Sequence, residues 1–177
     1  MTRGLGHAIL NLHYRKEKHM RALSGSYDHS VDAKNRIRIP AKLKSDLLGE
    51  PVEPEDKEQK KFNVVFHLGT GGCIEVYSEE EVEKIYSRFA DVKQSDTEKY
   101  KAVSIFLSTF EPVESDPQGR LVIPTMCRKY AKIEKDVKIC GRRNHIEIWS
   151  PERYDEFYGT QEMTVEGMAD LVKILDF

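Results

Sequence analysis

The chain has 177 residues, of which 39 % are hydrophobic and 33 % are charged, a balance typical of a globular protein with a highly charged surface. It contains no apolar run of the roughly 18 residues that a membrane-spanning helix needs, and its first residues lack the apolar core and cleavage site of a secretory signal. The three cysteines form no CxxC pair, which argues against a disulfide framework or a structural zinc site and fits a reducing cytoplasm.

Charge is distributed unevenly along the chain. Residues 1–48 carry ten Lys or Arg and four Asp or Glu, whereas the remaining residues carry 18 Lys or Arg and 26 Asp or Glu. The N-terminal part of the chain is therefore basic and the rest is acidic. Surface charges more than about 8–10 Å apart are largely screened, so a partner responds to this local potential more than to the net charge. The asymmetry is compatible with a nucleic-acid partner, and a solvated charged surface without a partner explains it equally well.

The first predicted elements are a short strand near 26–31, the turn DAKNR, and a second strand over 36–39. In the second strand arginine and isoleucine alternate, which places the isoleucines on one face. Pro40 then begins a short helix, because the first helical position has no hydrogen bond to lose, and Gly49 ends it. Three apolar side chains of this helix are expected to face inward: Leu43, Leu47 and Leu48.

A β-hairpin and two helices follow. The hairpin has the strands VVFHL (64–68) and CIEVY (73–77), joined by a glycine-rich turn in which positive φ is permitted. Ser78 and Glu81 form a capping box before an amphipathic helix. A further helix, capped by Ser95, is expected to carry four apolar side chains on one face: Val103, Phe106, Leu107 and Phe110.

The second half of the chain repeats this order. A strand near 110–115, the turn DPQGR and a helix after Pro124 precede a hairpin with strands over 137–140 and 145–149. The helix that begins at Ser150 and Pro151 is expected to direct three aromatic side chains to the core: Tyr154, Phe157 and Tyr158. A C-terminal amphipathic helix closes the chain.

Two alignments indicate that the halves are copies of one unit. Residues 30–44 match residues 114–128 at an offset of 84, and residues 73–78 match residues 145–150 at an offset of 72. The first alignment pairs Asp32 with Asp116, Arg36 with Arg120, Ile39 with Ile123 and Pro40 with Pro124. The offsets differ by the length of the polar stretch 50–61, which we expect to be a surface loop. Two copies are too few for a solenoid, so we expect them to pack about a pseudo-twofold axis.

Two Asp-x-x-x-Arg turns, each followed by an apolar strand and a proline, resemble the MraZ family. The stretches GCIEVYS (72–78) and IEIWSPERYDEF (146–157) are similar to the hairpin strands and following helices of that family. The resemblance implies an α+β fold, in which two tandem AbrB-like half-units form one β-barrel of the swapped-hairpin type with external helices. It divides the chain into a flexible N-terminal extension (1–23), a first repeat (24–91), a linking helix (92–108), a second repeat (109–158) and a C-terminal helix (159–177).

The resemblance also implies sequence-specific binding to double-stranded DNA. Members of the family bind short direct repeats ahead of their own division and cell wall gene cluster and regulate its transcription, and the expected effect here is repression. They assemble into a closed ring, for which we expect an octamer, and the expected location is the cytoplasm, in association with the nucleoid. The alternative is an AbrB-like antidote or protein-interaction scaffold, although such antidotes lack two motifs in one chain.

The first turn carries the residues that we expect to contact DNA. The carboxylate of Asp32 can accept backbone N–H bonds and fix the shape of the turn. The Arg36 guanidinium is then held ready for a phosphate or for the O6/N7 edge of guanine. The expected DNA contacts are Lys34, Asn35, Arg36 and Arg38. The alternative is an Asp–Arg pair that only holds its own turn.

The second turn is expected to act differently, because Gln118 and Val122 stand where the first copy has Lys34 and Arg38. Its strand, Arg-Leu-Val-Ile, is predicted to be buried. We therefore assign a turn-shaping role to four residues: Asp32, Asp116, Gly119 and Arg120.

Two features depart from the MraZ pattern. Asn35 stands where the family usually has glycine, and asparagine tolerates the left-handed conformation that the turn needs. Residues 1–19 precede the usual start of family members, which points to initiation at Met20 and makes the preceding segment an upstream extension or a basic arm.

The remaining reactive side chains suggest no enzyme. A cysteine such as Cys73 could in principle pair with His67 or His145, but no activated-nucleophile signature, phosphate loop or HExxH motif is present. We therefore expect no catalytic residue, no metal or other cofactor, no small-molecule substrate and no membrane partner.

Overall fold

The computed structural model describes residues 22–50, 60–159 and 164–175. The predictions for residues 1–19, and most of the prediction for the loop at 50–61, lie outside the described residues. No helix in the described ranges has the length and apolar character needed to cross a membrane.

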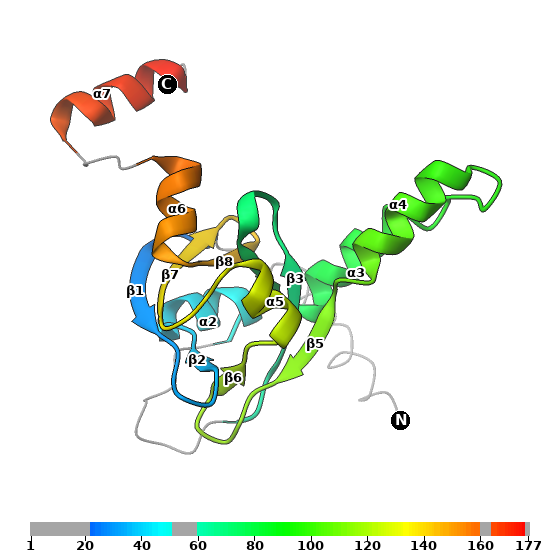
Figure 1. The fold of residues 1–177 in the computed structure, drawn as a ribbon, viewed down its shortest axis with the longest axis horizontal. Helices are drawn as coiled ribbons and strands as arrows, with labels where there is room; N and C mark the ends of the chain where they lie inside the picture. Colours follow the sequence, from blue (N-terminus) through cyan, green and yellow to red (C-terminus); the bar gives the residue numbers. More distant parts are fainter. Residues whose placement is uncertain (1–21, 51–59, 160–163, 176–177) are drawn as a thin grey trace, which may run out of the picture.

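An antiparallel sheet of six strands forms the centre of the molecule (Figure 1). Its strands, in the order β1-β7-β8-β4-β3-β5, are separate from a two-stranded ribbon of β2 and β6. The sheet comprises β1 (Ser26–Ser30), β3 (Asn63–Leu68), β4 (Ile74–Tyr77), β5 (Glu111–Glu114), β7 (Asp136–Arg142) and β8 (His145–Trp149). The ribbon comprises β2 (Arg36–Arg38) and β6 (Arg120–Val122).

The two copies of the repeat interleave in this sheet. Each copy contributes one hairpin, β3–β4 or β7–β8, and the first strand of each copy pairs with the hairpin of the other: β1 with β7, and β5 with β3. The two hairpins meet where β4 pairs with β8. The predicted α+β class, with antiparallel strands, is confirmed. Closure of the sheet into a barrel stays a prediction.

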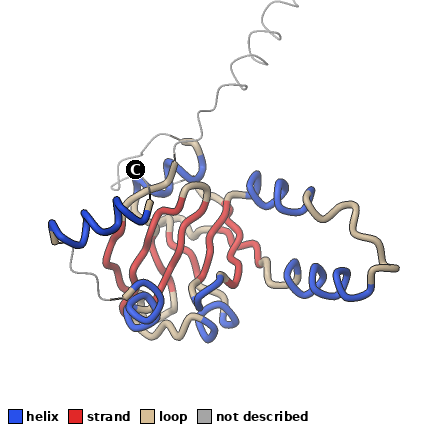
Figure 2. Tube along the Cα trace, turned by 90° about the horizontal axis from the view of Figure 1, so that it is seen from above, coloured by secondary structure: helices blue, strands red, loops and turns tan. Residues whose placement is uncertain are grey.

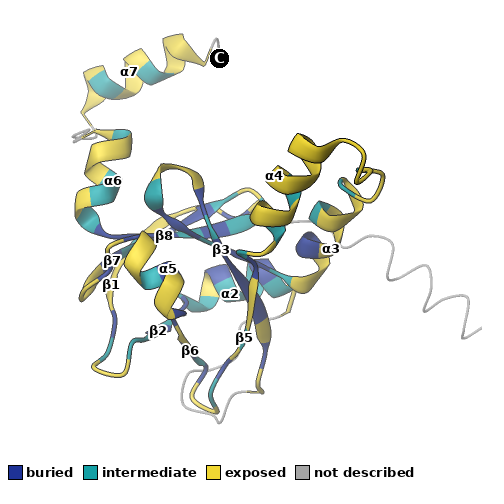
Figure 3. Ribbon diagram, turned by 45° about the vertical axis from the view of Figure 1, so that its right-hand side comes forward, coloured by how far each residue is buried: buried dark blue, intermediate teal, exposed yellow. Residues whose placement is uncertain are grey.

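The main core lies between one face of the sheet, the β2–β6 ribbon, and the helices α2 (Ala41–Leu48) and α5 (Thr125–Tyr130). Ile37 and Ile39 are both buried, which confirms the predicted alternation in the second strand. Leu43 and Leu47 are buried as predicted, and Leu48 packs partly buried against the same cluster. Gly49 ends α2 in the left-handed conformation, with φ 64°. Figure 3 shows these buried segments at the centre of the ribbon drawing.

Two further helices begin at caps that the sequence predicts. The hydroxyl of Ser78 accepts from the Glu81 N–H at the start of α3 (Glu79–Ser87), and that of Ser150 accepts from the Arg153 N–H at the start of α6 (Pro151–Tyr158). The prediction that Ser95 caps α4 (Thr97–Leu107) is wrong, because Asp96 holds that position. A carboxylate is the better acceptor there, since the positive end of the helix dipole also favours its charge.

The hairpin turns and the outer helices differ between the copies. The first hairpin turns through the 3-10 segment η1 (Thr70–Gly72), on which α6 packs. Tyr154 and Tyr158 pack against buried Trp149, but Phe157, predicted to face the core, is 53 % exposed. Helices α3 and α4 project together from one edge of the sheet, and α7 (Val165–Ile174) stands apart beyond α6 (Figure 2).

Candidate nucleic-acid interface

The first turn is closed around the carboxylate of Asp32. One oxygen of this group accepts the backbone N–H of Lys34 (2.8 Å) and of Arg36 (3.0 Å), and the other accepts Nε of Arg36 (2.7 Å). The Asn35 N–H donates to the Asp32 carbonyl at 2.9 Å. Asn35 has a φ of 56°, which confirms that asparagine adopts the left-handed conformation here.

The second turn repeats this geometry. Asp116 accepts the backbone N–H of Gln118 (3.0 Å) and of Arg120 (2.9 Å) with one oxygen and Nε of Arg120 (2.8 Å) with the other. Gly119 lies in the left-handed region with a φ of 72°, at the position equivalent to Asn35. In both copies the aspartate therefore fixes the turn and the arginine together.

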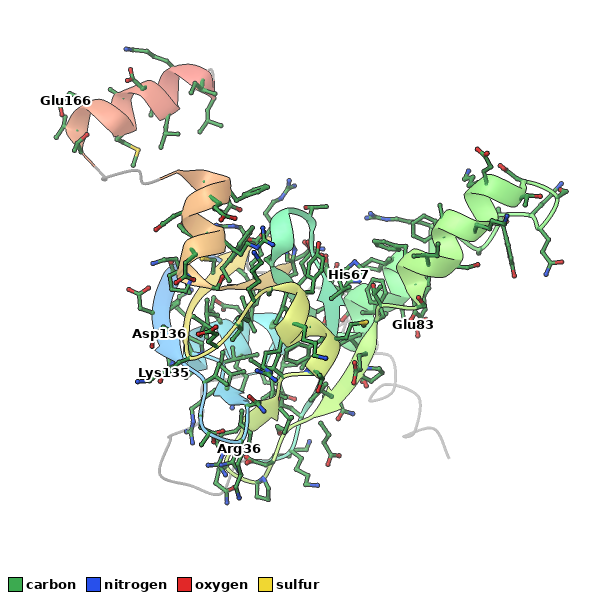
Figure 4. The ribbon with its side chains drawn as sticks, viewed as in Figure 1. Arg36, His67, Glu83, Lys135, Asp136 and Glu166 are labelled. Carbon is green, nitrogen blue, oxygen red and sulfur yellow. The ribbon has the colours of Figure 1, made fainter. Side chains whose placement is uncertain are left out.

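The β2–β6 ribbon brings the two turns to one end of the molecule. Arg36 lies opposite Val122, and Arg38 lies opposite Arg120. The ribbon is extended by a bond from the Ile123 N–H to the Asn35 carbonyl (2.9 Å). Figure 4 places Arg36 at this end, where the β1–β2 and β5–β6 loops lie.

The two turns are also linked by charge. Nη1 of Arg36 lies 3.5 Å from a carboxylate oxygen of Asp116, so Arg36 contacts the aspartates of both copies. The Arg36 guanidinium bonded to Asp32 lowers the pKa of that carboxyl from 3.8 to about 2. Burial opposes the ionisation of Asp116, but the backbone N–H and the guanidinium of Arg120 outweigh it, and the pKa of Asp116 lies below its usual value. Both carboxylates are therefore ionised at neutral pH.

Both turn arginines keep donors for a ligand. A guanidinium has five N–H donors. Arg36 directs three to aspartates, and Arg120 directs three to Asp116 and Gln118. The side chain of Arg36 is 22 % exposed, and that of Arg120 is 31 % exposed. The aspartates therefore clamp each guanidinium in one orientation but do not occupy all of its N–H donors.

The ribbon presents its outer face to solvent in both copies. In the strand of the second copy, which was predicted to be buried, Leu121 and Ile123 are buried, but the prediction is wrong for Val122, which is 52 % exposed. A two-stranded ribbon has only one face on the core, and Leu121 and Ile37 occupy that face. The cations Lys34 and Arg38 have no side-chain hydrogen bond or ion pair to any residue that the structure describes.

Comparison with known proteins then decides the family. A sequence model of the MraZ protein family, whose description includes the words "antitoxin-like", matches residues 22–103 and 105–172.

The chain belongs to the MraZ family.

Several curated relatives are each named a transcriptional regulator MraZ. The protein of Cytophaga hutchinsonii is 38 % identical over 134 residues, which cover 76 % of this chain and 83 % of the relative. The protein of Acetivibrio thermocellus is 33 % identical over 151 residues, covering 85 % and 96 %. That of a Thermoanaerobacter species is 35 % identical over 148 residues, covering 84 % and 94 %. The MraZ resemblance inferred from the two turns is therefore confirmed.

The cysteines, which could in principle be reactive, lie outside these MraZ turns. All three cysteines are buried: Cys73, Cys127 and Cys140. Burial raises the pKa of each thiol, that of Cys127 to about 11, which disfavours the reactive thiolate. Among the described residues, no group of three or more His, Cys, Asp or Glu side chains could hold a metal ion.

Sequence reasoning missed the contacts between the two turns. It considered each Asp–Arg pair alone, whereas the structure joins Arg36 to Asp116 and places Arg38 opposite Arg120. The repeat could have indicated these contacts, because a strand that lies beside a pseudo-twofold axis pairs with the equivalent strand of the other copy. In this MraZ relative the two motifs form one surface.

Proposed function

We propose that the protein is a sequence-specific, double-stranded-DNA-binding regulator of transcription. The observation that carries this proposal is the pair of aspartate-clamped arginine turns that the β2–β6 ribbon holds at one end of the molecule. Membership of a family whose curated members are named transcriptional regulators supports it.

The proposed contacts come mainly from the first turn. A guanidinium oriented by a carboxylate can donate two parallel bonds to the O6/N7 edge of guanine, and we assign this role to Arg36. Lys34, Asn35 and Arg38 flank it and are assigned to DNA contact. Asp32 and Asp116 fix the turns, together with Gly119 and Arg120. The flanks of the second turn, Gln118 and Val122, carry no charge.

The target we propose is a set of tandem short repeats ahead of the protein's own division and cell wall genes, with repression as the main effect. A ring of subunits, for which an octamer is the proposed size, would meet one repeat per subunit and add weak contacts by multivalency. Exposed apolar side chains on the outer helices support self-association, among them Ile105, Val165, Ile174 and Leu175. Such a protein would act in the cytoplasm, in association with the nucleoid.

Two matched alanine variants test this assignment. Arg36→Ala is expected to abolish the preference for operator over scrambled DNA while the assembly stays intact, at a cost of about 1–3 kcal/mol per subunit if Arg36 contacts a base edge. Arg120→Ala is expected to lower stability, because it frees Asp116, and to keep the preference. Mobility shifts, light scattering and thermal melts measure these effects. An Arg120→Ala protein that folds and assembles but shows no preference would mean that both turns contact bases.

A second candidate function is a protein-interaction module, which the exposed apolar side chains of α4 and α7 also fit. It predicts that wild-type protein shows no preference for the upstream region of its own genes. A mobility shift with that region, against scrambled DNA of equal length, separates the two functions.

A further inference from the structure

Two arginines face each other across the β2–β6 ribbon. Arg38 and Arg120 are paired directly in the antiparallel register. Ile37 and Leu121, one position along each strand, are buried, so both arginines lie on the outer face. Residues opposite one another in an antiparallel pair have Cβ atoms about 4.5–5.5 Å apart, and like charges in this arrangement destabilise the pair.

The two turn carboxylates face three arginines on this ribbon, so they do not compensate all of its positive charge. Asp32 is bonded to Arg36, and Asp116 is shared by Arg120 and Arg36. Nη1 of Arg120 has no partner in the part of the chain that the structure describes, and neither has the Arg38 side chain. A ribbon of three residues in each strand therefore holds an uncompensated positive charge beside unused guanidinium donors.

The repeat supplies an internal comparison. Under the pseudo-twofold relation, Arg36 is equivalent to Arg120, and Arg38 is equivalent to Val122. The two ends of the ribbon are thus an Arg–Val pair, Arg36 with Val122, and an Arg–Arg pair, Arg120 with Arg38. Arg38 follows the first turn in sequence, but in space it completes the second turn.

We propose that Arg38 and Arg120 together bind one phosphate group of the nucleic-acid backbone. This inference rests on the proposed DNA-binding function and gives the second turn a positioning contact, whereas Arg36 in the first turn contacts a base. A phosphodiester has two free oxygens and one negative charge, so it can accept hydrogen bonds from both guanidinium groups of a directly paired Arg38 and Arg120 and relieve their repulsion. Backbone contacts of this kind fix register and carry no sequence information.

The first experiment measures melting temperature without DNA, in sodium phosphate and in sodium chloride of matched ionic strength. Arg38→Gln is compared with Arg88→Gln, which removes the same charge from an exposed position at the end of α3. In chloride, Arg38→Gln is expected to melt about 1–3 °C higher than wild type, because the like-charge pair is gone. Phosphate is expected to raise the melting temperature of wild type and Arg88→Gln, and to have little effect on Arg38→Gln. Equal responses to phosphate in all three proteins would overturn the proposal.

The second experiment measures DNA affinity against salt. Arg38→Gln is expected to reduce the slope of log K against log salt by about 0.9 for each engaged subunit, and to lower affinity equally for operator and scrambled DNA. Val122→Arg builds the same pair at the other end of the ribbon and is expected to steepen the slope by a similar amount. A slope that neither substitution changes would contradict the phosphate site while leaving the DNA-binding function intact. Conversely, if phosphate stabilises the protein through Arg38 but wild type binds no duplex DNA, the anion site stands and the proposed function fails.

Discussion

At the scale of single residues, Asn35 and Gly119 show how one turn accommodates two side chains. Both have positive φ, 56° and 72°, and both donate their N–H to the aspartate carbonyl three residues before. A non-glycine residue in this region costs roughly 1–2 kcal/mol, and asparagine costs less than others. The difference between the copies is therefore small in energy, although glycine is the expected residue at both positions.

This gives a prediction for three substitutions. Asn35→Gly is expected to change the free energy of unfolding by a few tenths of a kcal/mol, whereas Asn35→Ala and Gly119→Ala are each expected to lower it by about 1–2 kcal/mol. Urea unfolding measures all three. Gly119 is buried and Asn35 is half-buried, so a smaller loss at Gly119 than at Asn35 would contradict the backbone explanation.

Acid sensitivity follows from the clamp of Asp32. The folded pKa of about 2 lies below the ordinary value of 3.8, so the unfolded chain takes up the proton first. The stabilisation is therefore complete above about pH 5 and is lost progressively as the pH falls through 3.8 towards 2. We expect the stability difference between wild type and Asp32→Asn to be constant from pH 7 to 5 and to shrink below pH 4. Thermal melts across this range measure it, and a difference that persists unchanged at pH 2.5 would refute the assignment.

At this scale the sequence predicted the roles of the aspartates but not the surface that they share. The spacing of Asp and Arg was sufficient to predict an Asx-type turn, because its hydrogen bonds are local. The Arg36–Asp116 contact joins residues 80 positions apart, and no local pattern encodes it.

At the scale of elements, α6 packs on the turn of the first hairpin through a glycine. A Cβ at Gly71 would lie 2.5 Å from the Phe157 ring and 3.0 Å from that of Trp149. A Cβ at the neighbouring Gly72 would meet only the flexible Arg153 side chain, at 3.4 Å or more, although its φ of 91° is as positive as the 80° of Gly71. A side chain at Gly72 would therefore add backbone strain, whereas a side chain at Gly71 would add both backbone strain and steric crowding against Phe157.

Substitution of each glycine by alanine is expected to show this difference. Both variants carry the cost of positive φ, and Gly71→Ala is expected to lose about 1–3 kcal/mol more, because the Phe157 ring or α6 itself must move. Thermal melts compare stability, and fluorescence of Trp149 reports the packing of α6. Equal losses without a change in Trp149 emission would argue against the crowding.

The sequence predicted most of these elements but not how they pack. Capping residues identified the starts of α3 and α6, because a cap acts on the next turn of its own helix. The start of α4 was predicted one residue early, since Ser95 and Asp96 are both good caps. Phe157 was placed in the core on helical spacing alone, whereas it covers Trp149 with one side and faces solvent with the other.

At the scale of the whole molecule, the repeat predicted two similar halves, and the structure shows that neither half is complete. The sheet pairs β1 with β7 and β5 with β3, so each copy lacks a neighbour for its first strand when alone. Periodicity and caps describe each half equally well whether or not strands are exchanged, so they could not reveal these pairings.

We therefore predict that fragments 22–91 and 92–175 do not fold as monomers, whereas an equimolar mixture recovers the sheet. Circular dichroism and sedimentation measure this. A fragment that pairs its first strand with a second copy of itself would instead show a melting temperature that depends on concentration. A monomeric 22–91 fragment that melts cooperatively and independently of concentration would show that the exchange of strands is dispensable.

The exchange of strands between the copies also determines when the sheet can be completed during synthesis of the chain. Asp28 in β1 contacts Lys138 in β7, 110 positions later in the chain. At about 5–20 residues per second, β1 waits roughly 5–20 s for the ribosome to supply its neighbour. The bonds within each turn are local and can form during this interval, and β6 is synthesised before β7, but the sheet on which the β2–β6 ribbon packs lacks two strands until β7 and β8 follow. A chain whose translation stops between β6 and β7 therefore contains both arginine turns but lacks two strands of the sheet that supports them.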